Sequence, residues 1–266
     1  MRLIAIDWSG AVIGAERHIW LAEVAEGEVV RLESGRSREQ MAAHLVQEIA
    51  RDPAMFIGLD FAFSFPRWFV EQQGCASAPE LWPIVAREGE RWLRDCQPPF
   101  WGRPGITRPD LHEHFRATDR AIAPVQGIRP KSVFQVGGAG AVGTGSIRGM
   151  PMLLQLREAG CAIWPFDPAT LPVAVEIYPR AMTGAVAKRN PEARSAYLDA
   201  RYPDLGEGIR AAAESSEDAF DALVSALVLA SIVPATGGLP LPPVTDPNAR
   251  HEGAIWAPVR PATPPD

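Results

Sequence analysis

The first thirty residues alternate between hydrophobic and polar positions at the spacing of β-strands. Residues 2–8 (RLIAIDW) have the pattern of a buried strand, and residues 18–24 and 28–34 alternate with a period of two. Glu26-Gly27 between them has the composition of a hairpin turn. We therefore expect three antiparallel strands at the start of the chain.

A helical period replaces the strand period after Ser37. Apolar residues recur at helical spacing from Met41 to Ile49, and the pattern stops at Pro53. Residues 55–63 (MFIGLDFAF) are then almost entirely apolar, as expected of a strand that is buried on both faces beside a parallel neighbour. The order of strand, strand, strand, helix and strand predicts a mixed α/β sheet.

The pattern is looser over residues 66–149, where short helices alternate with loops rich in proline and glycine. This stretch is longer than a connection requires, so we expect a functional insertion. Beyond it, regular patterns predict helices over 146–160, 191–214 and 215–233 and strands over 161–166 and 172–178. We expect one domain over 1–233 and a proline-rich surface tail over 234–266, with a late strand at 253–258.

The composition narrows the functional class. In 266 residues, 47% are hydrophobic, which excludes a disordered, collagenous or coiled-coil chain. The net charge of -6 gives no overall attraction to nucleic acid or anionic lipid, so any polyanion site must be local. Three cysteines without a C-x-x-C pair favour a reducing compartment, and no apolar run is long enough to span a bilayer. We expect a cytoplasmic protein without a membrane partner.

Acidic residues interrupt the apolar strands at three places. Asp7, Asp60 and Glu176 each lie in such a run, and burying an unpaired carboxylate costs several kcal/mol. Asp218 and Asp221 lie one turn apart on the predicted apolar helix and project from one face. Several of these acids can converge and share Mg²⁺ or Mn²⁺, the cations that carboxylates with open water positions suit.

Most of these acids also have a purely structural interpretation. Asp7 and Asp60 at strand ends could accept backbone N–H groups, and Glu176 could pair with Arg180. Asp218 could stabilise the start of its helix. Asp221 is harder to explain without a cation, because it lies a turn deeper among apolar neighbours.

Four segments, IDWSGA, GLDFAFSFP, VEIYPR and EDAFDALVSAL, occur in an order that resembles the domain of unknown function 429 family. That family is described as predicted nucleases of the ribonuclease H-like fold, and the similarity covers residues 1 to about 233. The resemblance implies a mixed five-stranded sheet flanked by helices, with three antiparallel strands followed by two parallel ones. The long insertion before the fifth strand departs from the minimal fold.

The resemblance also assigns roles to the acids. Asp7 matches the first-strand aspartate that bridges two metal ions, and Asp60 matches the acid of the fourth strand. Asp218 or Asp221, or both, would be the ligand from the last helix. Glu176 belongs to the E-x-Y-P signature of the narrower family, and we expect it, or Asp218, to act as a secondary ligand or to position the attacking water. The implied activity is metal-dependent hydrolysis of phosphodiester bonds in DNA or RNA.

Positive charge is concentrated in the predicted insertion. Residues 101–150 contain seven basic and three acidic residues, a local excess of +4. Such a loop can contact phosphates, and its candidate nucleic-acid contacts are Arg103, Arg116, Arg120, Arg129, Lys131 and Arg148. The alternative is a solvated loop whose arginines cap neighbouring helices.

Two other functions remain open at this point. The same strand order builds nucleotide-dependent phosphotransferases of the sugar-kinase and actin-like type, but the glycine after Asp7 comes one position late for their phosphate loop. A G-x-G-x-x-G pattern at 138–143, after a plausible strand at 131–136, is a weak signal for a nucleotide. The second alternative is a non-catalytic module that binds nucleic acid or protein.

Overall fold

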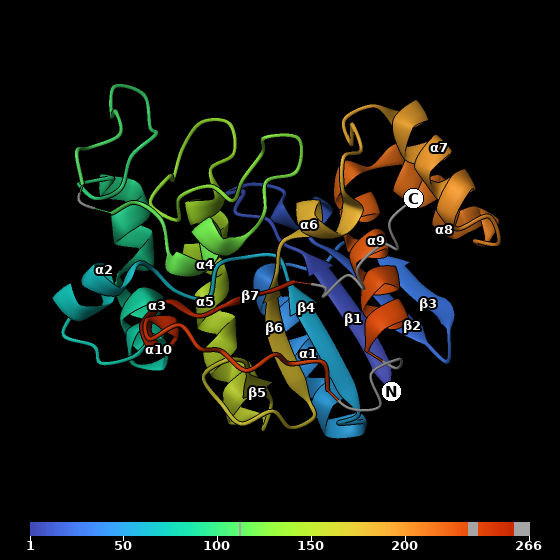
Figure 1. Cartoon of the computed structure of the whole chain (residues 1–266), viewed down its shortest axis with the longest axis horizontal. Helices are drawn as coiled ribbons and strands as arrows, with labels where there is room; N and C mark the ends of the chain where they lie inside the picture. Colours follow the sequence, from blue (N-terminus) through green and yellow to red (C-terminus); the bar gives the residue numbers. More distant parts are fainter. Residues whose placement is uncertain (112, 234–238, 258–266) are drawn as a thin grey trace.

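A mixed sheet of seven strands runs through the computed structural model, which describes residues 1–111, 113–233 and 239–257 (Figure 1). The strand order is β3-β2-β1-β4-β6-β5, and β7 also pairs with β6. The strands are β1 (Arg2–Asp7), β2 (Trp20–Ala25), β3 (Glu28–Glu33), β4 (Met55–Leu59), β5 (Ala162–Ile163), β6 (Val173–Ile177) and β7 (Ile255–Trp256).

The first three strands are antiparallel, as predicted, and β4 and β6 then pair in parallel with β1 and β4. The free edge of β6 is shared by two short strands. β5 pairs with its beginning, where Ala162 faces Val173, and β7 pairs with its end, where Ile255 faces Glu176. The mixed α/β class is confirmed, and the sheet extends beyond the five predicted strands.

Helices cover both faces of the sheet (Figure 1). On one face α9 packs on β1 and β2, with α6 and α8 against it; on the other, α5 packs against α1 and α3. The helices are α1 (Arg38–Arg51), α2 (Arg67–Gln72), α3 (Ala78–Asp95), α4 (Ala117–Ala121), α5 (Val142–Glu158), α6 (Pro179–Thr183), α7 (Pro191–Arg201), α8 (Glu207–Ser215), α9 (Glu217–Ile232) and α10 (Ala249–Glu252). None of the described helices has the length and apolar composition needed to cross a membrane.

The alternation of side chains along a strand decides which acids meet. Successive side chains point to opposite faces, and Leu3 of β1 packs in the cluster that includes α9. Asp7, four residues later, continues that face. On β4, Phe56 also packs on the α9 side, and Asp60, again four residues later, extends the ladder because its N–H donates to the Ile6 carbonyl. Both aspartates are thus directed to the layer that contains α9.

Three predicted elements differ in the structure. Residues 131–136 contain a turn and an isolated bridge from Gln135 to Trp101 but no strand, so the 138–143 pattern lacks the strand that a dinucleotide-binding turn requires. The helix predicted over 191–214 is divided into α7 and α8, because Pro203 disfavours helical backbone at the residue before it. The strand predicted over 161–166 is limited to β5, since Pro165 has no N–H to donate.

The predicted surface tail contributes to the sheet. Of this segment, residues 234–238 and 258–266 lie outside the described residues, but 239–257 include α10 and β7. Trp256 is 1% exposed and packs against Phe56 of β4. The late strand predicted at 253–258 is therefore present at Ile255–Trp256, as a part of the core rather than of a surface tail.

Candidate functional site

Three aspartates from different elements meet at one edge of the sheet. Asp7 ends β1, Asp60 follows β4, and Asp221 lies in the second turn of α9. Because β1 and β4 are parallel neighbours, their carboxyl ends lie together, and α9 packs across β1. Asp7 and Asp221 are 8% and 7% exposed, and Asp60 is partly buried. The predicted convergence of these acids is thus present in the fold.

The three carboxyl groups hold protons more tightly than ordinary aspartates. Burial raises the pKa of Asp7 well above its usual value, and the nearby charges of Asp60 and Asp221 raise it further. Burial and neighbouring charge raise the pKa of Asp60 to about 7, and burial raises that of Asp221 to about 6. The Asp7 and Asp60 carboxyl groups are close enough for the negative charge of Asp60 to act on Asp7. Such a group of acids favours either a bound proton or a bound cation.

The protein supplies one cation of its own, Lys188. This residue lies between α6 and α7, and its Nζ donates to Oδ2 of Asp221. Its positive charge opposes the rise in the pKa of Asp7, Asp60 and Asp221. Lys188 was not predicted from the sequence, although a signal was present. Of 26 Lys and Arg residues only two are lysines, and the other one, Lys131, lines the adjacent pocket.

Asp218 lies at the margin of the acid group. Its Oδ2 is 2.8 Å from Nδ1 of His18, and a third of its side chain is exposed. The N-cap of α9 is Ser216, whose hydroxyl accepts the N–H of Ala219, so Asp218 does not cap the helix. Of the two helix acids, Asp221 is therefore the one placed among the other carboxylates, and Asp218 acts on them from farther away.

Glu176 has a structural partner that the sequence did not reveal. In β6, Val175 packs on the α9 side and Ala174 on the opposite side, which Glu176 shares. Both Glu176 oxygens accept from the guanidinium of Arg116, which also binds Asp119. This network replaces the predicted pairing with Arg180. It also gives Glu176 a structural role, while the predicted catalytic role stays a prediction, because Glu176 lines the same pocket as Asp60.

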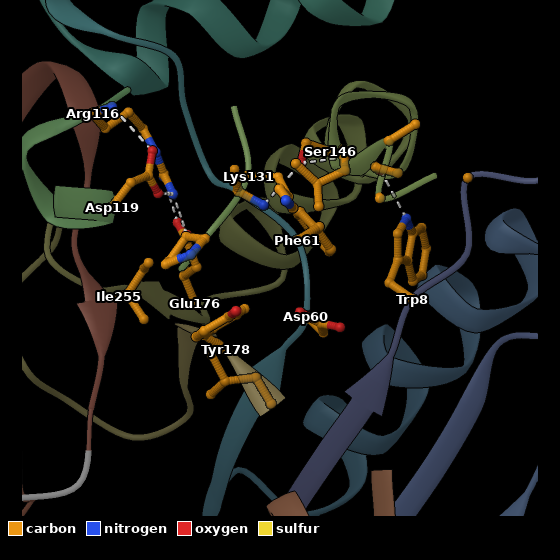
Figure 2. Close-up of a pocket in the computed structure, with 18 residues that line it drawn as sticks. Trp8, Asp60, Phe61, Arg116, Asp119, Lys131, Ser146, Glu176, Tyr178 and Ile255 are labelled. Atoms are coloured by element: carbon orange, nitrogen blue, oxygen red, sulfur yellow. Dashed lines mark hydrogen bonds and ion pairs between the residues drawn. The ribbon is translucent and has the colours of Figure 1, made fainter. Parts of the chain in front are cut away.

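A pocket of about 260 Å³ opens beside the acids. It lies between the ends of β4 and β6, the first turn of α5 and the segment that carries Lys131 (Figure 2). Figure 2 shows Asp60 and Lys131 on opposite sides of this pocket, with Trp8 and Tyr178 also lining it. The pocket therefore combines a basic and an acidic wall with three aromatic side chains, those of Trp8, Phe61 and Tyr178.

The predicted nucleic-acid contacts have different environments. Arg116 is 2% exposed and fully engaged by carboxylates, which corrects the prediction that it contacts nucleic acid. Arg148 binds Glu90 and the Gly10 carbonyl. The other candidates are exposed or partly exposed: Arg103, Arg120 in an ion pair with Glu113, Arg129 with the Ile122 carbonyl, and Lys131 on the pocket wall.

The carboxylate oxygens of the three aspartates have the chemistry of ligands for a hard divalent cation. Carboxylate oxygens are the ligands that Mg²⁺ and Mn²⁺ prefer, and Oδ1 of Asp221 is buried without a hydrogen-bond partner. In the described part of the chain, no three His, Cys, Asp or Glu side chains are already grouped as metal ligands. Because Lys188 already occupies Oδ2 of Asp221, a cation has access to this carboxylate only through Oδ1 unless the ion pair opens.

None of the protein-family models, curated proteins or solved structures with which the chain was compared matches it. The ribonuclease H-like fold and the resemblance to the domain of unknown function 429 family therefore stay predictions. The geometry of the acids, Lys188 and the pocket is what bears on the function of the chain.

Proposed function

We propose that this protein is a metal-dependent nuclease of the ribonuclease H-like type. The observation that carries the proposal is the meeting of Asp7, Asp60 and Asp221, from two adjacent parallel strands and one helix, with raised pKa values and an unpartnered buried oxygen. The strand order β3-β2-β1-β4-β6, with three antiparallel strands and then two parallel ones, supports the same assignment.

In this proposal the three aspartates hold Mg²⁺ or Mn²⁺. A divalent cation held in this way lowers the pKa of a coordinated water and stabilises negative charge on phosphate oxygens. Lys131, across the pocket from Asp60, holds a phosphate by its positive charge. Trp8 and Tyr178 line the same pocket, and aromatic rings are the platforms on which unpaired bases stack.

Positive charge at the pocket and on the insertion supports a nucleic-acid substrate, although the chain as a whole is acidic. Lys131 faces the pocket, and Arg103 and Arg129 are exposed on the same insertion, whereas the whole chain has a net charge of -6. All three cysteines are free and buried, which supports a cytoplasmic location because that compartment is reducing.

The direct test is cleavage of labelled single-stranded and double-stranded DNA and RNA in Mg²⁺, in Mn²⁺ and in chelator. We expect cleavage with either cation and none in chelator. Asp7→Asn should lower the rate by at least about 100-fold, because it removes a charge that binds the cation, while the fold is retained. The matched control is Asp204→Asn, the same change at an exposed aspartate, which should cleave like the wild type.

Three outcomes would contradict the proposal. Cleavage that persists in chelator would exclude a metal-dependent reaction. Calorimetric binding of ATP without cleavage of any nucleic acid would favour the phosphotransferase. Binding of nucleic acid without cleavage in either cation would favour the non-catalytic module.

A further inference from the structure

We propose that Lys188 is a permanent cationic member of the acid site, in the position of a second metal ion, so that the site binds one divalent cation. This inference rests on the metal site of the proposed function. It concerns the number of ions, because the resemblance implies a first-strand aspartate that bridges two.

The contact between Lys188 and Asp221 places the two oxygens of the Asp221 carboxylate in different environments. Nζ of Lys188 donates to Oδ2, and the side chains of Lys188 and Asp221 are 8% and 10% exposed. Oδ1 is buried and has no hydrogen-bond partner. Lys188 thus fixes Asp221 by one oxygen and leaves the other available to a cation that Asp7 and Asp60 also approach.

The fold holds Lys188 in this position through its backbone. The guanidinium of Arg194, itself 3% exposed, donates to the carbonyl of Lys188 and to that of Glu214 near the end of α8. The Lys188 N–H donates to the Val186 carbonyl, which also accepts from Arg180. The backbone of the segment between α6 and α7 is therefore fixed by hydrogen bonds. It holds the buried side chain of Lys188 beside Asp221.

The charges of the site then balance with one divalent cation. Lys188 neutralises Asp221, and Asp218 lies at the margin of the site with a third of its side chain exposed, which leaves Asp7 and Asp60. These two carboxylates carry at most two negative charges, the amount that one divalent cation neutralises. Two more distant charges act on the pKa of Asp221 in opposite directions, since Glu217 raises it and Arg180 lowers it. A second divalent cation would make the site positive.

The use of lysine at this position agrees with that role. The chain places arginine at 24 of its 26 cationic positions, since only Lys131 and Lys188 are lysines. An ammonium is a compact point charge, whereas a guanidinium is a planar fork. The compact group is the closer equivalent of a metal ion between carboxylates.

The test counts bound ions. The metal-free protein is titrated with Mn²⁺, and free Mn²⁺ is measured by electron paramagnetic resonance. We expect one bound Mn²⁺ per wild-type chain and two for Lys188→Met, which removes the charged terminal nitrogen and keeps an unbranched side chain of nearly the same length. The matched control is Arg189→Met, which removes a positive charge at the exposed neighbouring position and should bind one. The rise in melting temperature on Mn²⁺ addition should be larger for Lys188→Met than for the wild type.

The double variant Lys188→Met with Asp221→Asn covers the case in which the single variant does not fold. It removes both charges of the pair and should bind one ion. Two ions on the wild-type chain, one ion on a folded Lys188→Met, or two on the double variant would each overturn the inference. Absence of Mn²⁺ binding to the wild type and to Lys188→Met would instead overturn the metal site of the proposed function.

Discussion

Asp7, Asp60 and Asp221 bind protons more tightly in the folded chain than an unfolded chain would, since their folded pKa values lie above the ordinary aspartate value of 3.8. Folding stability therefore falls as pH rises from about 4 through the folded pKa values near 6 and 7. This dependence is opposite in sign to that of aspartates stabilised by salt bridges.

We predict that the metal-free protein loses about 4 kcal/mol of unfolding free energy between pH 5 and pH 8 through Asp60 and Asp221 alone. Urea denaturation in chelator at both pH values measures the change. Asp60→Asn should remove much of it, because asparagine does not titrate, and Asp204→Asn should leave it unchanged. Mn²⁺ should reduce the loss, since the cation binds the ionised acids. Stability that rises with pH, or a dependence unaffected by Asp60→Asn, would contradict the prediction.

At the scale of residues, the sequence was sufficient to identify the acids but not their partners. Asp7 and Asp60 were recognisable because a carboxylate in an apolar run requires compensation. Lys188 was not, because it lies in a connecting segment without periodicity. The partner of Glu176 was missed for a similar reason, since Arg116 is 60 positions away on an insertion whose path no local pattern encodes.

At the scale of elements, the ion pairs of Arg116 join β6 to α4. Arg116, Asp119 and Glu176 are all less than 5% exposed, so each charge depends on the others for solvation. The N–H of Phe63, just beyond β4, also donates to Glu176. One carboxylate therefore holds together the end of β6, the loop after β4 and the insertion.

We predict that Glu176→Gln lowers the unfolding free energy by about 3 kcal/mol, because it leaves the buried charge of Arg116 less well compensated. It should leave the number of bound Mn²⁺ ions unchanged, since Glu176 faces away from α9. The matched control is Asp199→Asn, which removes the exposed partner of Arg210 and should cost less than about 1 kcal/mol. Wild-type stability together with lost Mn²⁺ binding would assign Glu176 to the metal site instead.

The elements that the sequence predicted well are those with a clear period. The strands β1 to β4 and the helices α1 and α9 follow from alternation and from apolar residues at helical spacing. Proline interrupts two of the predicted elements, the helix over 191–214 at Pro203 and the strand over 161–166 at Pro165. A single proline changes the local backbone without changing the spacing of apolar residues around it, so the spacing alone does not reveal the interruption. The segment 131–136 has an apolar composition that is compatible with either a strand or a packed loop.

At the scale of the whole molecule, the segment that contains α10 and β7 connects the insertion to the sheet. The carboxylate of Glu252, 1% exposed, accepts the backbone N–H groups of Arg67 at the start of α2 and Ala117 at the start of α4. The N–H of Ile255 donates to the hydroxyl of Thr118. This arrangement could not be predicted, because its contacts join positions more than 130 residues apart.

We predict that Glu252→Gln costs about 1–3 kcal/mol, because an amide has one acceptor oxygen and cannot satisfy both buried N–H groups. The melting temperature should fall accordingly, with or without Mn²⁺. Glu158→Gln, at an exposed position near the end of α5, is the control and should change stability by less than about 0.5 kcal/mol. Equal melting temperatures for Glu252→Gln and the wild type would show that this junction is dispensable.

Because the chain has only two lysines, its response to amine-directed reagents differs from that of most proteins. Apart from the terminal amine, the groups that an activated ester can acylate are the exposed Lys131, on the pocket wall, and the buried Lys188. Arginines provide the remaining cationic surface, and such esters do not acylate them. Immobilisation or dye labelling through lysine would therefore modify the pocket first, whereas attachment through a terminus would leave it open.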